Sequence, residues 1–188
     1  MKQKLLVVAC LLAFITIGCS KGTETLYGKA ILKVNVDYEK QPGPGSNQWA
    51  IWIEDEAGNL IKTLFVTSFT ADGGYTFRAN SLPIWVAKAN PSEHNGETID
   101  AYSGATPQTG IHSYVWDLTD EDGTPVANGT YRFVFEATLF GDSEVIYQAD
   151  FLVEDKAASI KAEPKFTSEN EKNKDMIRGV TAQFELVP

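Results

Sequence analysis

Alternation of apolar and polar side chains is the feature that most constrains how this chain folds. Residues 29–38, KAILKVNVDY, carry an apolar side chain at every second position. Successive side chains of a strand point to opposite sides, so this period of two predicts a strand with one face in a core. Residues 144–153 and 179–187 are predicted to be further strands, and aromatic and β-branched residues, which favour sheets, are common along the chain.

Residues 48–64 predict a β-hairpin. The runs WAIWI and LIKTL flank EAGN, in which Gly58 and Asn59 tolerate positive φ. Trp49 and Trp52 are separated by an odd number of positions, so they are predicted to face opposite sides of the first strand, with one of them in the core. Residues 112–140 have the pattern of a second hairpin-like unit, with the turn sequence TDEDGTPVANG between two apolar runs.

The strand pattern predicts an all-β fold. The 188 residues are enough for one domain with a core, and we expect an immunoglobulin-like antiparallel β-sandwich over residues 28–188. Residues 68–110 do not alternate and are predicted to be a long inserted loop. Within it, residues 81–90 have the pattern of one short helix, with Ser81 as its N-cap.

The N-terminus has the pattern of a bacterial signal peptide. Residues 1–4 are basic, and the apolar run of residues 5–17 is too short to span a bilayer comfortably. A small residue then precedes Cys19, which resembles a lipobox. The resemblance implies removal of residues 1–18, a diacylglyceryl group on Cys19, and a tether over residues 19–27. The alternative is an ordinary secretory signal cleaved nearby. We expect a protein of the bacterial cell envelope that faces the periplasm, on either the inner or the outer membrane.

Charge and cysteine usage exclude several classes of function. The two cysteines are Cys10, inside the signal, and Cys19, so the mature domain would have neither a disulfide nor a cysteine metal site. The formal charge is −9, and loss of residues 1–18 removes two lysines and no acid, which leaves −11. An acidic chain without a basic run is unsuited to nucleic acid. Acyl chains rather than charge would hold it at a membrane.

An acidic turn suggests calcium at first sight, but its spacing is wrong. A helix–loop–helix calcium site needs an acid at position 1 and a glutamate at position 12. With Asp120 and Asp122 at positions 3 and 5, those positions fall on Leu118 and Gly129. We therefore predict a hairpin turn here, flanked by Asp117, and no metal.

The two histidines are weak candidates for chemistry. His94 and His112 have no spacing typical of a metal site. A hydrolase that uses Ser103 and His112 would lack the G-x-S-x-G elbow. We expect His112 to begin a strand and His94 to lie in a polar loop.

Residues 100–106, DAYSGAT, fit the pattern D-x-x-[ST]-G-A-[ST]. This run resembles the covalent flavin-attachment motif of bacterial extracytoplasmic FMN-binding domains, such as the flavin subunits of ion-pumping respiratory complexes. In those proteins a magnesium-dependent flavin transferase moves FMN from FAD onto the last hydroxyl, as a phosphoester. The resemblance implies Thr106 as the acceptor, with recognition by Asp100, Ser103, Gly104 and Ala105. The alternative is a glycine turn that leads into a strand over residues 112–117.

The chemistry of such a motif is simple. The acceptor needs a hydroxyl and small neighbours, and the modifying enzyme supplies the base. A chain without a cysteine or histidine cluster could then take part in redox reactions, because the cofactor carries the reactivity. Aromatic rings that could stack against a planar ligand are Tyr102, Trp85 and Trp116, although Trp85 and above all Trp116 could equally be core residues.

A wider resemblance covers residues 48–140. The runs W-I-x-D-x-x-G-N-L-I-K-T-L, L-P-x-W, D-A-Y-S-G-A-T-P and W-D-x-x-D-x-D-G-x-P-V look like a family of uncharacterised periplasmic proteins. Members of that family tend to be encoded near flavin transferases and membrane redox proteins. The later part also resembles the immunoglobulin-like domain of the flagellar hook-cap protein, which concerns fold alone.

The sequence leads to two hypotheses of different classes. The first is a lipid-anchored electron-transfer protein with covalent FMN, matured by a flavin transferase and paired with a membrane redox protein. Such a carrier would have no catalytic residues of its own. The second is a cofactor-free immunoglobulin-like lipoprotein that binds or scaffolds other envelope proteins.

Overall fold

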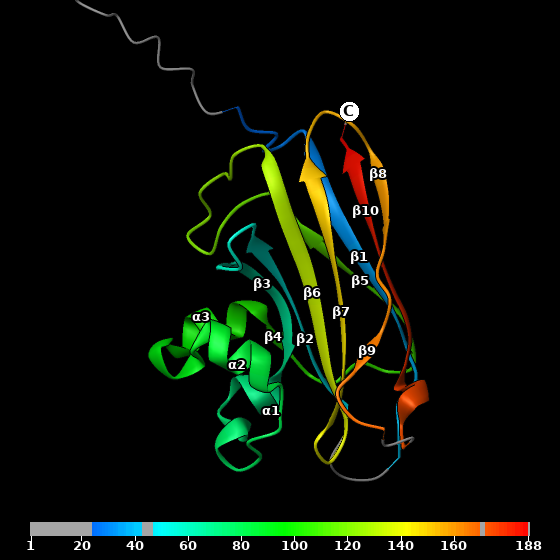
Figure 1. The fold of residues 1–188 in the computed structure, drawn as a ribbon. Helices are drawn as coiled ribbons and strands as arrows, with labels where there is room; N and C mark the ends of the chain where they lie inside the picture. Colours follow the sequence, from blue (N-terminus) through cyan, green and yellow to red (C-terminus); the bar gives the residue numbers. More distant parts are fainter. Residues whose placement is uncertain (1–23, 43–46, 170–171, 188) are drawn as a thin grey trace, which may run out of the picture.

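The computed structural model describes residues 24–42, 47–169 and 172–187, and it consists mainly of two β-sheets packed face to face (Figure 1). The four-stranded sheet has the order β5 (Gly110–Trp116), β1 (Ala30–Tyr38), β10 (Ile177–Leu186), β8 (Ala158–Lys161). The six-stranded sheet has the order β4 (Ser103–Gly104), β3 (Leu60–Thr67), β2 (Gln48–Asp55), β6 (Gly129–Phe140), β7 (Ser143–Val153), β9 (Lys165–Phe166). All neighbouring strands are antiparallel except β3 and β4, which are parallel. The predicted all-β class is therefore confirmed at the level of a two-sheet β fold with a helical insert.

The alternation along β1 is confirmed by its burial. Leu32, Val34 and Val36 are completely buried, while the residues between them are partly exposed. These side chains enter the main core between the sheets with large aromatic residues from the facing sheet, among them Trp49 and Phe135. Period-two patterning thus places the inward face of β1 correctly.

The first predicted hairpin is also confirmed. Strands β2 and β3 pair antiparallel, and Gly58 takes a positive φ of 82° in the turn between them. Trp49 belongs to the main core, and Trp52 belongs to a second cluster on the other face of the strand. Both tryptophans are buried, because the insertion covers the outer face of the six-stranded sheet.

The second predicted hairpin is wrong. β5 pairs with β1 in the four-stranded sheet, whereas β6 pairs with β2 and β7 in the other sheet. Between β5 and β6, Leu118 turns the chain with a φ of 63° and buries its side chain in the main core. Alternation shows which face of a strand is buried, but it does not show which sheet the strand joins.

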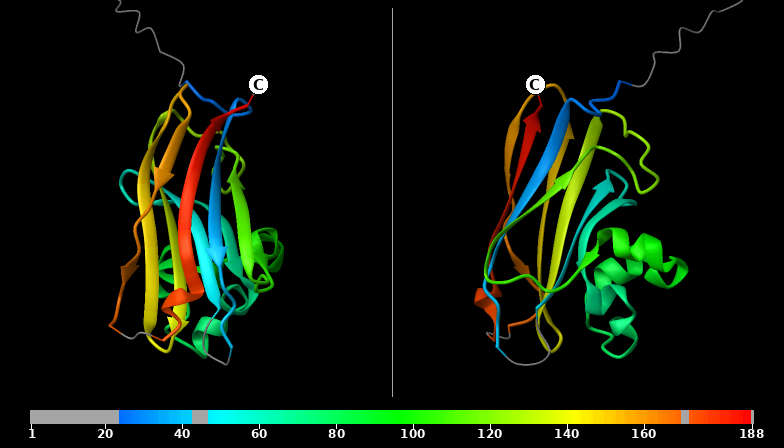
Figure 2. Two further views of the ribbon diagram at one scale, coloured as in Figure 1. Left: turned by 90° about the vertical axis from the view of Figure 1, so that its right-hand side faces the viewer. Right: turned by 180° about the vertical axis from the view of Figure 1, so that it is seen from behind.

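The insertion between β3 and β5 contains three short helices and two 3₁₀ turns instead of one helix. They are α1 (Ser68–Ala71), η1 (Gly74–Thr76), α2 (Pro83–Ala89), η2 (Pro91–Glu93) and α3 (Gly96–Tyr102); a further turn, η3 (Lys174–Met176), precedes β10. Figures 1 and 2 show the helices on the side of the six-stranded sheet that faces away from the four-stranded sheet. Their apolar side chains form the second cluster with that sheet: Ala50, Trp52, Val66, Ala71, Leu82, Trp85, Ala89 and Val134.

The predicted short helix exists as α2, but Ser81 does not cap it. The Ser81 hydroxyl is hydrogen-bonded to that of Thr70, 2.6 Å away. The first turn of α2 is instead capped by the carboxylate of Glu136 on β6, which accepts from the backbone N–H groups of Ile84 and Trp85. A cap that comes from about fifty residues further along the chain leaves no local sequence signal.

The two ends of the described chain lie at the same end of the sandwich (Figure 1). The first described residue is Glu24, whose carbonyl accepts a hydrogen bond from the N–H of Asn128 beside the start of β6. The predicted signal peptide and Cys19 lie outside the described residues. In the part that is described, no helix is long and apolar enough to cross a membrane.

Candidate functional site

The DAYSGAT run spans the end of α3, the two residues of β4, and the start of a loop over residues 105–109. We call residues 105–109 the crossover loop, because they lead from the six-stranded sheet to β5 of the four-stranded sheet. Asp100 is exposed on α3, and Ser103 and Gly104 pair with Val66 and Thr67 of β3. The structure therefore keeps the motif together at one edge of the sandwich.

Gly104 is in close contact with the ring of Phe65. A Cβ atom added to Gly104 would lie 2.8 Å from Phe65 Cε2, which is closer than such atoms approach in proteins. The Phe65 ring in turn packs against Tyr114, with ring centroids 4.9 Å apart. The glycine of the motif thus has a packing role that does not depend on any cofactor.

Thr106 places its hydroxyl at the junction of the crossover loop and the segment that precedes β2. Its Oγ1 donates a hydrogen bond to the backbone carbonyl of Asn47 over 3.3 Å. The residue is partly buried, and its neighbour Ala105 is exposed. A hydroxyl that donates one hydrogen bond keeps oxygen lone pairs for a second partner.

The rest of the crossover loop is attached on two sides. The Thr109 hydroxyl accepts a hydrogen bond from the N–H of Lys40, 3.0 Å away. His112 Nε2 lies 2.6 Å from the carbonyl oxygen of Gln108. A carbonyl can only accept, so His112 carries a proton on Nε2 and donates it. These contacts hold the loop in a defined position although it contains neither helix nor strand.

Asn47 is the centre of a small hydrogen-bond network. Its Oδ1 accepts from the Tyr38 hydroxyl at 2.7 Å and from the Gln41 N–H at 3.0 Å, and its Nδ2 donates to the Gln41 carbonyl at 2.9 Å. Asn47 also has a positive φ of 71°, a conformation that asparagine tolerates better than most residues. Burial raises the pKa of Tyr38 to about 12, so its hydroxyl remains a donor at physiological pH.

Aromatic rings pack beneath this network. Tyr38 meets Trp49 edge to face with ring centroids 4.6 Å apart, and His112 lies 5.9 Å from Trp49. Sequence reasoning overlooked Asn47 and Phe65, because their contacts with the motif join residues far apart in the chain, and it overlooked Tyr38, which holds Asn47.

A protein-family model for DUF2271, described as a predicted periplasmic protein, matches residues 31–170. The chain belongs to the DUF2271 family. This finding confirms the expected likeness to a family of predicted periplasmic proteins and agrees with an envelope location. No curated protein and no solved structure matches the chain.

The three aromatic residues predicted as ring contacts do not form one site in this DUF2271 chain, because Trp116 lies in a different cluster from Trp85 and Tyr102. Trp85 is completely buried in the second cluster, with Nε1 donating to the Thr63 hydroxyl. Trp116 is completely buried in the main core, with Nε1 donating to the Thr119 carbonyl. Neither ring has an open face against which a planar ligand could stack. Both tryptophans are core residues, which was the alternative considered for them.

Tyr102 is the third of these aromatic residues, and it is partly buried beside Trp85. Its hydroxyl lies 3.0 Å from His94 Nδ1, and burial raises its pKa to about 12. Phe65, whose ring lies next to Gly104, and Tyr114, which packs against Phe65, are both partly exposed.

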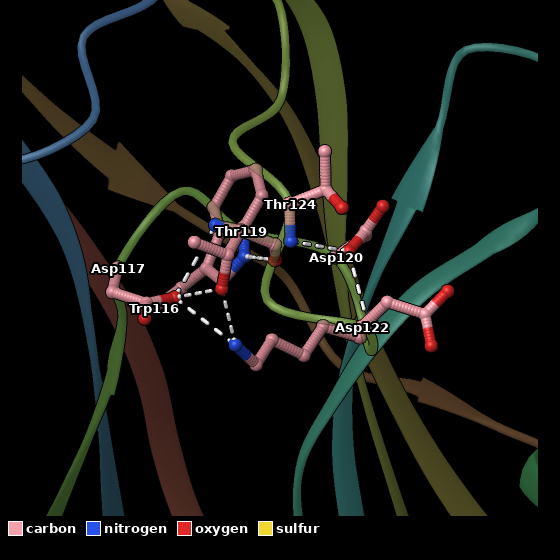
Figure 3. Close-up of polar contacts among 7 residues, drawn as sticks. Trp116, Asp117, Thr119, Asp120, Asp122 and Thr124 are labelled. Carbon is pink, nitrogen blue, oxygen red and sulfur yellow. Dashed lines mark hydrogen bonds and ion pairs between the residues drawn. The ribbon is translucent and has the colours of Figure 1, made fainter.

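The predicted acidic turn is present (Figure 3), but it is not the turn of a hairpin, because β5 and β6 belong to different sheets. Asp120 Oδ1 accepts from the N–H groups of Asp122 and Thr124, and a bridge joins Thr119 to Pro125. Asp117 forms an ion pair with Lys62 over 3.1 Å. Within the described ranges, no group of three or more His, Cys, Asp or Glu residues could hold a metal ion.

The hydrolase hypothesis gains no support from the DUF2271 fold. His112 Nε2 is bound to the Gln108 carbonyl, and Ser103 lies in β4. Among the residues that the structure describes, no hydrogen bond joins these two side chains. His112 does lie within β5, near its start.

Proposed function

We propose that this protein is a lipid-anchored electron-transfer protein of the cell envelope that carries FMN covalently on Thr106. One observation carries the proposal: the motif ends at a partly exposed threonine on a loop, beside exposed Ala105, in a member of a family of predicted periplasmic proteins. An enzyme that modifies a folded protein needs such an accessible hydroxyl with small neighbours. FMN would supply the redox chemistry, so the chain needs no reactive side chain of its own.

The attachment step balances without a further reactant. Thr106 Oγ1 forms the new bond to the phosphorus of the FMN half of FAD. The bond from that phosphorus to the oxygen of the AMP phosphate breaks, and AMP leaves. The hydroxyl proton passes to the flavin transferase, which also holds the magnesium ion. Asp100, Ser103, Gly104 and Ala105 would form the surface that the transferase recognises.

The position of Thr106 suits exchange of electrons with a partner protein. The described chain begins beside the start of β6, next to Asn128, whereas Thr106 contacts Asn47, which is held by Tyr38 at the far end of β1. Ala30 and Tyr38 are the two ends of the nine-residue strand β1. Such a strand spans roughly 25–30 Å. A lipid on Cys19 would hold one end at the membrane and leave the Thr106 end free to meet a membrane redox protein.

A cofactor-free envelope module is the second candidate, and one observation favours it. Gly104 is required by its contact with Phe65, so the best-defined part of the motif has a purely structural explanation. In this alternative the sandwich, immunoglobulin-like in topology, would bind or scaffold other envelope proteins.

Intact mass separates the two candidates. The mature domain would be co-expressed with a flavin transferase, alongside Thr106→Ala and, as a matched hydroxyl in the same loop, Thr109→Ala. We expect an addition of about 440 Da at end point on wild type and Thr109→Ala but not on Thr106→Ala, since the cofactor is attached at one hydroxyl. An unmodified wild type, with the transferase active on a known target, would favour the cofactor-free module.

A further inference from the structure

The acceptor hydroxyl is held by a residue outside the motif. Thr106 Oγ1 donates to the carbonyl of Asn47, which is 59 positions earlier in the chain. Thr106 lies in the crossover loop and has no strand or helix of its own to fix it. The contact with Asn47 therefore restricts where this hydroxyl lies and how it is oriented.

Asn47 is itself fixed by its side chain. The amide makes three hydrogen bonds, of which one goes to the hydroxyl of Tyr38 and two go to the backbone of Gln41. Tyr38 is buried at the end of β1, and its ring packs on Trp49. A rigid core residue thus holds the backbone to which the Thr106 hydroxyl is bonded.

Orientation of a nucleophile is a large term in catalysis, and misplacement by about 1 Å can cost on the order of 100-fold in rate. We propose that Tyr38 and Asn47 are positioning residues that orient the Thr106 hydroxyl for modification by the flavin transferase. This inference rests on the proposed function. Neither residue touches the reacting phosphorus; they act through the crossover loop. The long 3.3 Å hydrogen bond to Asn47 orients the hydroxyl and is easily given up when its proton is transferred.

Tyr38→Phe is the test substitution, because it removes one hydroxyl and leaves the ring against Trp49. The matched control is Tyr131→Phe, since the Tyr131 hydroxyl also donates one hydrogen bond, here to the backbone carbonyl of Ala127 at 2.9 Å, beside the start of β6. With purified transferase and FAD, we expect Tyr38→Phe to lower the kcat of flavin transfer about tenfold, with little change in KM. Tyr131→Phe should match the wild type, and all three proteins should reach the same mass at end point.

Substitution of Asn47 gives a second test. Asn47→Asp keeps an oxygen acceptor and tolerates positive φ, whereas Asn47→Gly keeps the backbone freedom but removes every side-chain hydrogen bond. We expect Asn47→Asp to be modified faster than Asn47→Gly. Hydrogen exchange of the unmodified proteins gives a readout without flavin. The backbone amides of the crossover loop, of which Pro107 has none, should exchange faster in Tyr38→Phe and Asn47→Gly than in Tyr131→Phe.

The outcomes distinguish this inference from the function on which it rests. A wild-type protein that is never modified would overturn the flavin function and the positioning role together. A wild type that is modified, with Tyr38→Phe and Asn47→Gly modified at the same kcat, would overturn the positioning role alone. A Tyr38→Phe protein with unchanged exchange in the crossover loop would also contradict it.

Discussion

Glu136 Oε2 on β6 lies 2.8 Å from the backbone nitrogen of Trp85 in α2, and this contact joins the helical insertion to the six-stranded sheet. The second carboxylate oxygen accepts from the N–H of Ile84. Glu136 is completely buried. Burial raises the pKa of its carboxyl to about 7, an effect that outweighs the lowering caused by the two hydrogen bonds.

This raised pKa predicts that the protein becomes less stable as pH rises. The folded state favours the protonated carboxyl, so the stabilisation is complete below the ordinary value of 4.5 and is lost as pH rises through about 7. We expect titration of the Glu136 carboxyl to make the free energy of unfolding, measured in urea, about 2–3 kcal/mol smaller at pH 8 than at pH 5. Glu136→Gln should remove most of this difference, whereas exposed Glu56→Gln should keep it. An equal pH dependence in both variants would show that other groups cause it.

Gly104→Ala is predicted to destabilise the edge of the sandwich. The new methyl group would have to displace the ring of Phe65, which lies 2.8 Å from the position of the added Cβ. Overpacking of this kind costs about 1–3 kcal/mol. Gly179→Ala on β10 is the matched control, because a Cβ there meets no atom within 4 Å. Urea unfolding of both variants measures the difference.

A double-mutant cycle identifies the cause. Phe65→Leu replaces the ring that blocks the added methyl group with a smaller side chain. Gly104→Ala should therefore lower the free energy of unfolding less in the Phe65→Leu background than in the wild type. Strict additivity of the two substitutions would exclude the ring as the source of the strain.

Local pattern was sufficient to predict β1, the hairpin of β2 and β3, and helix α2, because each depends on residues adjacent in sequence. It failed for β5 and β6, whose partners are set by the whole sandwich. Local pattern also failed to predict what covers the outer face of the six-stranded sheet. Trp52 on that face is buried by the inserted helices, and nothing in the sequence indicated that these helices form an apolar layer.

The candidate site was predicted only in part, for the same physical reason. The motif of residues 100–106 was visible as a continuous run. The contact of Thr106 with Asn47 joins residues 59 positions apart, and the packing of Gly104 on Phe65 comes from the parallel pairing of β4 with β3. Trp85 and Trp116 were candidates because their rings could stack against a planar ligand, yet the fold places them in two separate clusters.

Trp85→Ala is predicted to loosen the insertion. Trp85 is completely buried in the second cluster and donates a hydrogen bond to the Thr63 hydroxyl on β3. Truncation of a buried tryptophan costs about 3–5 kcal/mol. Limited proteolysis should cut residues 68–110 before the strands, and urea unfolding should shift to lower concentration. Phe77→Ala is the control, because the Phe77 side chain is 88% exposed, and it should behave like the wild type. Cleavage at the strands first would show that the insertion is not the part held by Trp85.

Lys88→Met is predicted to destabilise the same region through a partly buried ion pair. Lys88 Nζ lies 2.9 Å from Glu54 Oε1, and the Glu54 side chain is only 6% exposed. Glu54 also accepts a hydrogen bond from Trp52 Nε1, so the carboxylate cannot leave its site freely. Loss of the lysine leaves a poorly hydrated charge without its cation, which should cost about 1–3 kcal/mol.

Lys161→Met isolates the contribution of burial to this effect. Lys161 and Glu163 form an ion pair of similar length, 2.8 Å, but their side chains are 77% and 74% exposed. Water already solvates both charges of such a pair, so its loss should leave the free energy of unfolding almost unchanged. The unfolding free energies of the two variants would be compared at low and at high salt. If Lys88→Met changed the free energy of unfolding as little as Lys161→Met does, the ion pair of Lys88 with Glu54 would not contribute to the stability of the fold.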